Sequence, residues 1–192
     1  KVAFGRIVET NRKNFSVKIT QEKQQPQSKI QISIAQAIVK SDRTKEMLEL
    51  ITQSGVHELI PWSAEHSIGK WQTNSRLKWQ TSIYEAAKQC HIYSVPSVQE
   101  VSSTKQLIEK FTDYDQVILL DQNAEDPISK VYKIGKSKIL LIIGPEGGVS
   151  DAETAQFKNT NVLAAKLANS TFRSAHVALA ATSAINTLAG NW

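Results

Sequence analysis

The chain has 192 residues, of which 41% are hydrophobic and 21% charged, which is typical of one compact globular domain with room for a small appended module. Apolar runs such as "ILLII" are far too short to span a membrane, and the single cysteine, Cys90, permits no internal disulfide and no thiolate metal site. Because no apolar run has membrane length and the first residues show no export pattern, we expect a cytoplasmic protein. A formal net charge of +5 and a pI near 9.3 favour a polyanionic partner.

The first 28 residues show the period-two alternation of a β-hairpin. "KVAFGRIVET" and "NFSVKIT" alternate apolar and polar residues, and "NRKN" between them is a polar turn. Two strands alone are only marginally stable, so we expect this hairpin to be the end of a small β-domain. Because the chain opens at Lys1 rather than at Met, we expect the natural start to be missing or processed. "QEKQQPQSK" is then predicted to be a polar linker.

From residue 29 onward, predicted strands alternate with predicted helices. The strands are "KIQISIAQAI", "VHELIPW", "SVPSV", "QVILLDQ", "KILLII" and "NVLAAKLA". The helices are "DRTKEMLELITQS", with Ser41 as its N-cap and Gly55 as its stop, "NSRLKWQTSIYEAAKQC", "STKQLIEKF", "SDAETAQFKN" and "SAHVALAATSAINTLAG". Continuous apolar strands separated by helices are typical of a parallel sheet covered on both faces. The predicted fold class is therefore α/β, with residues 1–28 in one domain and residues 29–192 in another.

The segment "KILLIIGPEGGVSDAET" passes directly from a strand through a turn into a helix. Three glycines, the first at Gly144, follow the strand, and Ser150 with Glu153 forms a capping-box pattern that starts the helix. Glycines let a ligand touch backbone groups that a side chain would cover. The spacing is not that of a dinucleotide or triphosphate loop, and Glu146 would repel phosphate. The turn therefore indicates a neutral or cationic ligand; a tight connection that binds nothing is the alternative.

Five segments carry a resemblance that runs over nearly the whole chain: "AIVKSDRTKEML", "SGVHELIPWSAEHS", "WQTSIYEAAKQC" followed by "VPSV", "IGPEGGVSDAE" and "KLANSTFRSAHVALAA". On these motifs the sequence resembles the RsmE family of the SPOUT superfamily, whose members use S-adenosylmethionine to methylate N3 of one uridine in small-subunit (16S) ribosomal RNA. The resemblance implies a SPOUT-type parallel sheet with a C-terminal trefoil knot, preceded by the remnant of a small PUA-like RNA-binding β-barrel. It also implies a homodimer, ribosomal RNA of the small ribosomal subunit as partner, and no metal.

Carried over position by position, the resemblance implies that S-adenosylmethionine lies among three loops. These are the end of "QVILLDQ", the glycine turn, and the loop of residues 167–173. The residues expected to bind this methyl donor are Leu119, Leu120, Ile143, Gly144, Pro145, Glu146, Gly147, Gly148, Leu167, Ala168, Phe172 and Arg173. The cationic sulfonium of the donor is compatible with the nearby carboxylate of Glu146.

Methylation of uridine N3 requires loss of the imide proton, because the lone pair of the neutral nitrogen is delocalised into two carbonyls. A site for this reaction needs a fixed positive charge at O2 or O4 of the base. Arg173 matches the final Arg of the family loop and is the first candidate for that charge; a solvent-facing arginine at a helix start is the alternative. His176 is the candidate general base, since imidazole can accept a proton near neutral pH, although the family usually has Thr there.

Four further positions are predicted to contact RNA. Lys40 and Arg43 match the basic residues of the family's Lys-Gly-Asp-Arg turn, with phosphate contact as the functional interpretation and a solvated helix start as the alternative. Glu85 and Gln89 lie four residues apart on one helix face and also match family positions. A surface ion pair between Glu85 and Lys88 is the alternative to an RNA contact.

The chain departs from the family pattern in charged positions. The family loop usually reads Leu-Gly-x-Arg-Ile-Leu-Arg-Thr-Glu-Thr-Ala, whereas residues 167–177 lack its first Arg and its Glu, and Ser41 replaces Gly in "KSDR". A non-catalytic relative that binds ribosomal RNA as an assembly factor is therefore an alternative, and a related SPOUT enzyme that acts on transfer RNA ribose is another. The last helix is apolar around much of its circumference, which an internal core or a dimer interface would explain.

Overall fold

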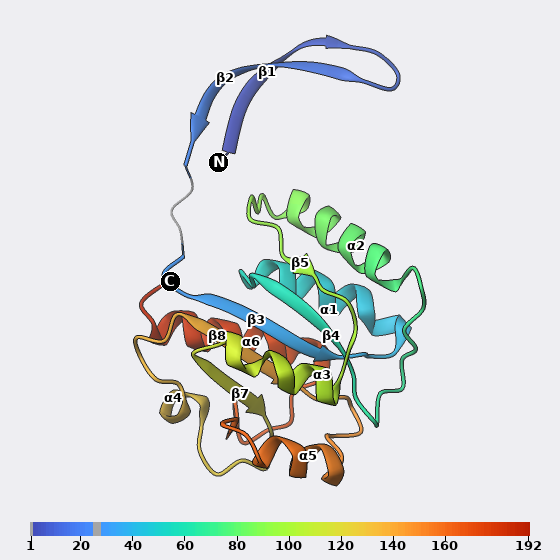
Figure 1. Cartoon of the computed structure of the whole chain (residues 1–192). Helices are drawn as coiled ribbons and strands as arrows, with labels where there is room; N and C mark the ends of the chain where they lie inside the picture. Colours follow the sequence, from blue (N-terminus) through green and yellow to red (C-terminus); the bar gives the residue numbers. More distant parts are fainter. Residues whose placement is uncertain (1, 25–27) are drawn as a thin grey trace.

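The computed structural model describes residues 2–24 and 28–192, which form an N-terminal hairpin and an α/β body (Figure 1). In the hairpin, β1 (Val2–Thr10) pairs antiparallel with β2 (Phe15–Lys23), as the period-two alternation predicts. The strand β2 continues through Lys23, so it includes the first residues of the predicted linker. The central part of that linker, residues 25–27, lies outside the described residues.

The body is built on a parallel sheet of seven strands. Its strands in spatial order are β5 (Ser97–Val98), β4 (Glu58–Ser63), β3 (Gln31–Ala37), β8 (Lys138–Ile143), β7 (Gln116–Leu120) and β9 (Leu163–Ala165), and β6 (Ser102–Ser103) also pairs with β4. Every pairing within this sheet is parallel. The α/β class and the parallel sheet predicted from the sequence are confirmed.

Helices cover both faces of the sheet (Figure 1). On one face pack α1 (Ser41–Gln53), α2 (Ser75–Gln89), α4 (Ile128–Val131) and α6 (Ser174–Leu188), and on the other α3 (Thr104–Glu109), the 3-10 helix η1 (Lys110–Asp113) and α5 (Asp151–Lys158). The central strands alternate between these two cores: Ile139 and Leu141 of β8 belong to the first, and Leu140 and Ile142 to the second. Burial on both faces explains why "KILLII" is continuously apolar.

Helix starts agree with the sequence in one case and differ in another. At α5, the Ser150 hydroxyl accepts a hydrogen bond from the Glu153 N–H and the Glu153 carboxylate accepts one from the Ser150 N–H, each at 3.2 Å, which confirms the capping box. The predicted N-cap of α1 is wrong, because Ser41 is the first helical residue and Lys40 holds the cap position without a side-chain cap.

The sequence does not predict α4 or β6. Each is only two to four residues long, so neither shows a period that could be recognised. Of the helices in the described part of the chain, none is long and apolar enough to cross a membrane.

Candidate functional site

A pocket of about 580 Å³ lies beyond the carboxyl ends of β7, β8 and β9. Three segments form its walls: the loop after β7, the glycine turn after β8, and the segment that joins β9 to α6. Ligands of open parallel sheets bind at such a place, because several loops converge there. The three loops expected from the sequence are thus brought together by the fold.

Nine of the residues predicted to bind the methyl donor line this pocket. They are Leu120, Gly144, Pro145, Glu146, Gly147, Gly148, Leu167, Ala168 and Phe172. The others do not line it: Leu119 and Ile143 are buried in the core beneath the pocket, and Arg173 is exposed at the N-cap of α6. The neighbours of Arg173 on both sides, Phe172 and Ser174, do line the pocket, so its backbone lies at the rim.

The sequence reasoning missed a polar wall of the pocket. Asp121, Gln122 and Asn123 line it directly after β7. Gln122 accepts a hydrogen bond of 2.8 Å from the hydroxyl of Thr171, which ties the loop after β7 to the loop after β9. The position of these residues at the end of an apolar strand was the signal that could have identified them.

The glycine turn has a backbone that only glycine adopts without strain. Gly148 has a φ of +79°, in the left-handed region. A Cβ built on Gly144 would lie 2.9 Å from Cγ2 of Val149, and one on Gly147 would lie 3.2 Å from Cβ of His66. A side chain at Gly144 or Gly147 would therefore crowd its neighbours, and both glycines line the pocket.

A buried hydrogen-bond chain fixes the turn against the start of α6. The amide nitrogen of Gln36, a fully buried residue of β3, donates to the Ser174 hydroxyl at 3.1 Å. That hydroxyl donates to the carbonyl of Gly144, also at 3.1 Å. These two hydrogen bonds connect β3, the start of α6 and the glycine turn, and they hold the turn in place against the helix.

A second buried anchor lies behind the turn. The Glu153 carboxylate, 4% exposed, accepts hydrogen bonds from the Glu65 N–H at 3.0 Å and from the Thr104 hydroxyl at 2.7 Å, besides its capping bond. Glu65 belongs to the loop after β4, whose next residue, His66, lies 3.1 Å through Nδ1 from the Gly148 carbonyl. Glu153 therefore connects α5, α3 and the loop that supports the glycine turn.

The pocket has an acidic lining. Among the described residues that line it are three carboxylates, Asp121, Glu146 and Asp151, and no Lys, Arg or His. One cation reaches this lining from outside: a guanidinium nitrogen of Arg43 lies 3.8 Å from the Glu146 carboxylate. Such a lining favours a cationic ligand and disfavours phosphate.

Three further residues with predicted roles, Lys40, Arg43 and His176, lie at the N-terminal ends of α1 and α6. Lys40 is exposed, and Arg43 pairs with Glu146 rather than standing free. His176 does not line the pocket; its Nε2 lies 3.0 Å from the carboxylate of Glu46 on α1. These contacts bring α1, the glycine turn and α6 together at one edge of the pocket.

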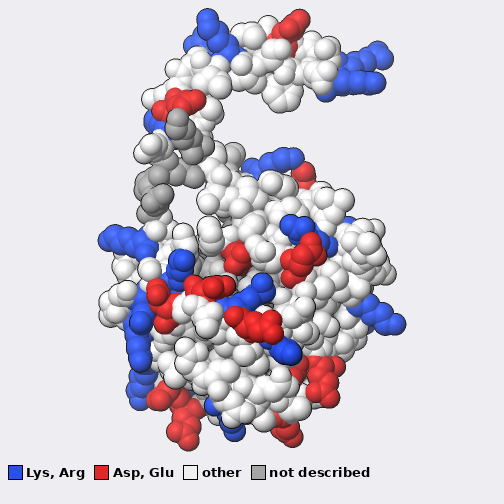
Figure 2. All heavy atoms as spheres, in the orientation of Figure 1, with Lys and Arg blue, Asp and Glu red and all other residues white. Residues whose placement is uncertain are grey.

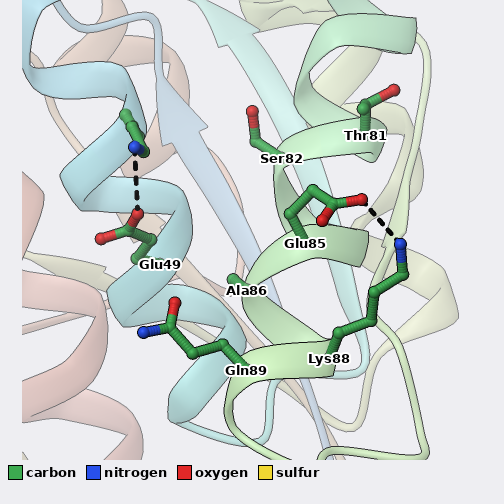
Figure 3. Close-up of a pocket in the computed structure, with 8 residues that line it drawn as sticks. Glu49, Thr81, Ser82, Glu85, Ala86, Lys88 and Gln89 are labelled. Carbon is green, nitrogen blue, oxygen red and sulfur yellow. Dashed lines mark hydrogen bonds and ion pairs between the residues drawn. The ribbon is translucent and has the colours of Figure 1, made fainter.

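Glu85 and Gln89 lie apart from the pocket, in a groove of about 570 Å³ between α1 and α2 (Figure 3). The groove shares no lining residue with the pocket. Glu85 accepts a hydrogen bond of 2.7 Å from Lys88 on α2, and Glu49 pairs with Lys45 at 3.9 Å, one turn apart on α1. The ion pair between Glu85 and Lys88 that the sequence offered as an alternative is thus present.

Comparisons with known proteins agree on one family. Residues 26–186 match the model of a family described as RNA methyltransferase domain. The chain is 25% identical over 169 residues to the ribosomal RNA small subunit methyltransferase E of Mycobacterium bovis, and 28% identical over 168 residues to that of Bacillus subtilis. These matches cover 84% and 82% of this chain but 64% and 66% of those proteins, so the chain spans just under two thirds of the length of these curated relatives.

Solved structures show the same fold. One is a ribosomal RNA small subunit methyltransferase E from Neisseria gonorrhoeae bound to S-adenosyl methionine, with a TM-score of 0.87, 22% identity, and coverage of 96% of this chain and 77% of that one. Another is a putative methyltransferase from Legionella pneumophila in complex with the same cofactor, with a TM-score of 0.87, 24% identity, and coverage of 96% and 78%.

Proposed function

Because this chain belongs to the RNA methyltransferase family that includes the ribosomal RNA small subunit methyltransferases E, the RsmE family, we propose that it transfers a methyl group from S-adenosylmethionine to N3 of a uridine in small-subunit ribosomal RNA. The observation that carries the proposal is the acidic pocket beyond β7, β8 and β9. Its glycine turn, its position and its charge all suit this donor, and two solved relatives of the same fold hold the donor.

The charge of the pocket fits the charge of the donor. At neutral pH S-adenosylmethionine carries a sulfonium, an ammonium and one carboxylate, so it is a net monocation. Asp121, Glu146 and Asp151 supply negative charge around the pocket, while Leu120, Leu167 and Phe172 supply apolar surface for the adenine. The carbonyls of Gly144 and Gly148 already contact Ser174 and His66, so the donor is proposed to bind other backbone groups of the turn, which the glycines leave uncovered. When bound, the donor supplies an electrophilic methyl group.

Arg173 is proposed to stabilise the uracil anion. Its side chain is exposed, and among the described residues it has no hydrogen bond or ion pair, so the guanidinium is available to a substrate. It flanks the pocket between Phe172 and Ser174. A fixed cation at O2 or O4 of the base stabilises the charge that develops when N3 loses its proton.

His176 is proposed to accept the N3 proton. It stands on the first turn of α6, three residues after Arg173, and its Nε2 lies 3.0 Å from Glu46. A carboxylate beside an imidazole orients the ring and stabilises the imidazolium that forms. Because neither Arg173 nor His176 lines the pocket, both would act on the base at the rim rather than on the donor.

RNA is proposed to approach over the start of α1 and the hairpin. Lys40 and Arg43 are exposed or half-exposed beside the pocket, where phosphate contacts would position the substrate. Residues 2–24 carry five basic and two acidic side chains, and basic groups stand out at the end of the hairpin in Figure 2. Contacts of Glu85 and Gln89 with RNA are proposed in the groove between α1 and α2, where Lys45 and Lys88 also lie.

Residues 1–28 are proposed to be part of a PUA-like RNA-binding β-barrel, and residues 29–192 to be the SPOUT catalytic domain. Large apolar side chains of the hairpin are exposed, among them Ile7 at 65% and Phe15 at 68%. A two-stranded sheet cannot bury such residues, so they favour a larger β-unit around the hairpin.

A trefoil knot is proposed for the C-terminal part of the body. The segment after β7 is hydrogen-bonded along the segment after β9: the Asp121 N–H donates to Ala165, Lys166 donates to Asp126, and Ile128 donates to Lys166. Beyond this contact the chain continues into α6, which packs against both α4 and α1. Threading of the C-terminal segment past the loop after β7 is compatible with these contacts.

A homodimer acting in the cytoplasm is the proposed form of the protein. On α6, the apolar side chains of Ala180, Ala184 and Leu188 are only partly buried, which is compatible with a partner on this helix. Light scattering on the purified protein tests this proposal, and a single monodisperse monomer at micromolar concentration would contradict it.

The proposed reaction is tested with S-adenosylmethionine and unmodified small ribosomal subunits. Calorimetry measures donor binding, and labelled donor followed by nucleoside analysis measures methyl transfer to uridine N3. Binding together with transfer supports the proposal. Binding without transfer would replace it with the non-catalytic assembly factor, and methylation of transfer RNA ribose instead would point to the other SPOUT activity.

A further inference from the structure

Among the described residues, Arg43 is the one cation that forms an ion pair with a carboxylate of the pocket lining. It stands in the first turn of α1, and its guanidinium lies 3.8 Å from the carboxylate of Glu146. The two side chains are 44% and 22% exposed, so the pair is partly open to solvent. The other two carboxylates of the lining, Asp121 and Asp151, have no ion pair within the described part of the chain.

The proposed reaction changes the charge of the molecule in the pocket. Before transfer the donor has a sulfonium and a net charge of plus one; after transfer the sulfur is a neutral thioether, and S-adenosylhomocysteine has no net charge. The two molecules otherwise present the same adenine, ribose and amino-acid groups. Apart from space for the methyl group itself, the electrostatic potential of the pocket is therefore the property that distinguishes donor from product.

We infer that Arg43 sets the preference of the pocket for the methyl donor over the demethylated product, by neutralising Glu146. The inference rests on the proposed function. A free Glu146 carboxylate attracts the sulfonium and is indifferent to the thioether, whereas a carboxylate that is held by a guanidinium attracts the sulfonium less. Arg43 thus acts as a positioning residue, through Glu146, and it touches neither the donor nor the base.

The same pair gives RNA an influence on the pocket. Arg43 lies three residues after the exposed Lys40, in the segment proposed to contact phosphate. A phosphate that draws the guanidinium away from Glu146 would leave the carboxylate free and would bias the pocket towards the donor. The separation of 3.8 Å and the exposure of both partners make the pair easy to exchange.

The inference is tested by the dissociation constants of S-adenosylmethionine and S-adenosylhomocysteine, measured by calorimetry on the full chain. In Arg43→Gln we expect the ratio of product to donor dissociation constants to rise about threefold, from loss of one partly screened charge near the sulfonium. Arg43→Lys keeps the charge and should keep the ratio near that of the wild type. Glu146→Gln should lower the ratio. In that background Arg43→Gln should raise the ratio by a smaller factor than in the wild type, because only the direct repulsion between guanidinium and sulfonium then remains.

Arg76→Gln is the matched control. Arg76 is also a half-exposed arginine in an ion pair, with Glu100 at 2.8 Å, and it does not line the pocket. Arg76→Gln changes the net charge by the same amount as Arg43→Gln, but at a site outside the pocket. Its ratio of product to donor dissociation constants should therefore equal that of the wild type.

The outcomes separate this inference from the proposed function. If the wild type binds both ligands and Arg43→Gln leaves their ratio unchanged, the inference is overturned while the proposed function stands. If the wild type binds neither ligand, the proposed function itself fails. Circular dichroism checks the fold of Arg43→Gln; should that variant unfold, Glu146→Gln decides, and a ratio that does not fall in it overturns the inference.

Discussion

Replacement of Glu153 by Ala should destabilise the protein more than any exposed change in the same helix. The carboxylate is 4% exposed and accepts three hydrogen bonds, from Thr104 at 2.7 Å, from the Glu65 N–H at 3.0 Å and from the Ser150 N–H at 3.2 Å. Ala would leave three donors without this acceptor, of which the Ser150 N–H is buried and the other two are partly buried. Because one buried unpaired group costs about 1–3 kcal/mol and part of this cost is relieved by water or relaxation, we expect a loss of about 3 kcal/mol in the free energy of unfolding.

The assay is thermal and denaturant unfolding followed by circular dichroism. For a domain of this size, a loss of about 3 kcal/mol corresponds to a fall in Tm of about 6–12 °C. Glu153→Gln keeps an acceptor oxygen and should lose less, about 1–2 kcal/mol. Asp151→Ala in the same first turn is the control, since Asp151 is exposed and contributes only through the helix dipole, about 0.3–1 kcal/mol. A Glu153→Ala variant as stable as Asp151→Ala would refute the role given to this network.

Other predictions follow from single features of the structure. Gly148→Ala should lower the free energy of unfolding by about 1–2 kcal/mol, because φ is +79° there. It should also weaken donor binding, measured by calorimetry, more than Gly135→Ala does. At Gly135 φ is also positive, but that turn is remote from the pocket. Hydrogen bonds from the backbone N–H groups of Lys138 and Ser137, and from the Ser137 hydroxyl, lower the pKa of Asp115 to about 2 from its usual 3.8. A lowered folded-state pKa stabilises the fold above pH 3.8 and loses its effect as pH falls towards 2, so wild type and Asp115→Asn should differ in Tm at pH 5 and converge near pH 2. Equal differences at both pH values would contradict this assignment.

The parts of the site that sequence could predict are those with local signals. The glycine turn follows an apolar strand and precedes a capping box, so its position at the end of a parallel strand could be derived from "KILLIIGPEGGVSDAET" alone. The family resemblance then identified nine of the residues that line the pocket. Leu119 and Ile143 were predicted beside them because they adjoin the loops, but their side chains alternate into the core.

The parts that sequence could not predict depend on contacts between distant segments. Arg43 and Glu146 are separated by more than half of the chain, and only the folded sheet brings the start of α1 to the glycine turn. The same holds for His176 and Glu46, and for the contact of Gln36 with Ser174. The start of α1 was predicted one residue too late, because Ser41 is a common N-cap residue. In the structure Ser41 is the first helical residue and Lys40 is the N-cap.

The most direct test of the central claim is methyl transfer by the wild type and by Arg173→Ala, with labelled S-adenosylmethionine and unmodified small ribosomal subunits. Arg173 does not line the pocket, so the variant should bind the donor with an unchanged Kd. Its rate of transfer to uridine N3 should fall about 100-fold, as is usual when one group that stabilises a developing oxyanion is removed. Transfer at the wild-type rate by Arg173→Ala, or donor binding by the wild type without any transfer, would contradict the account.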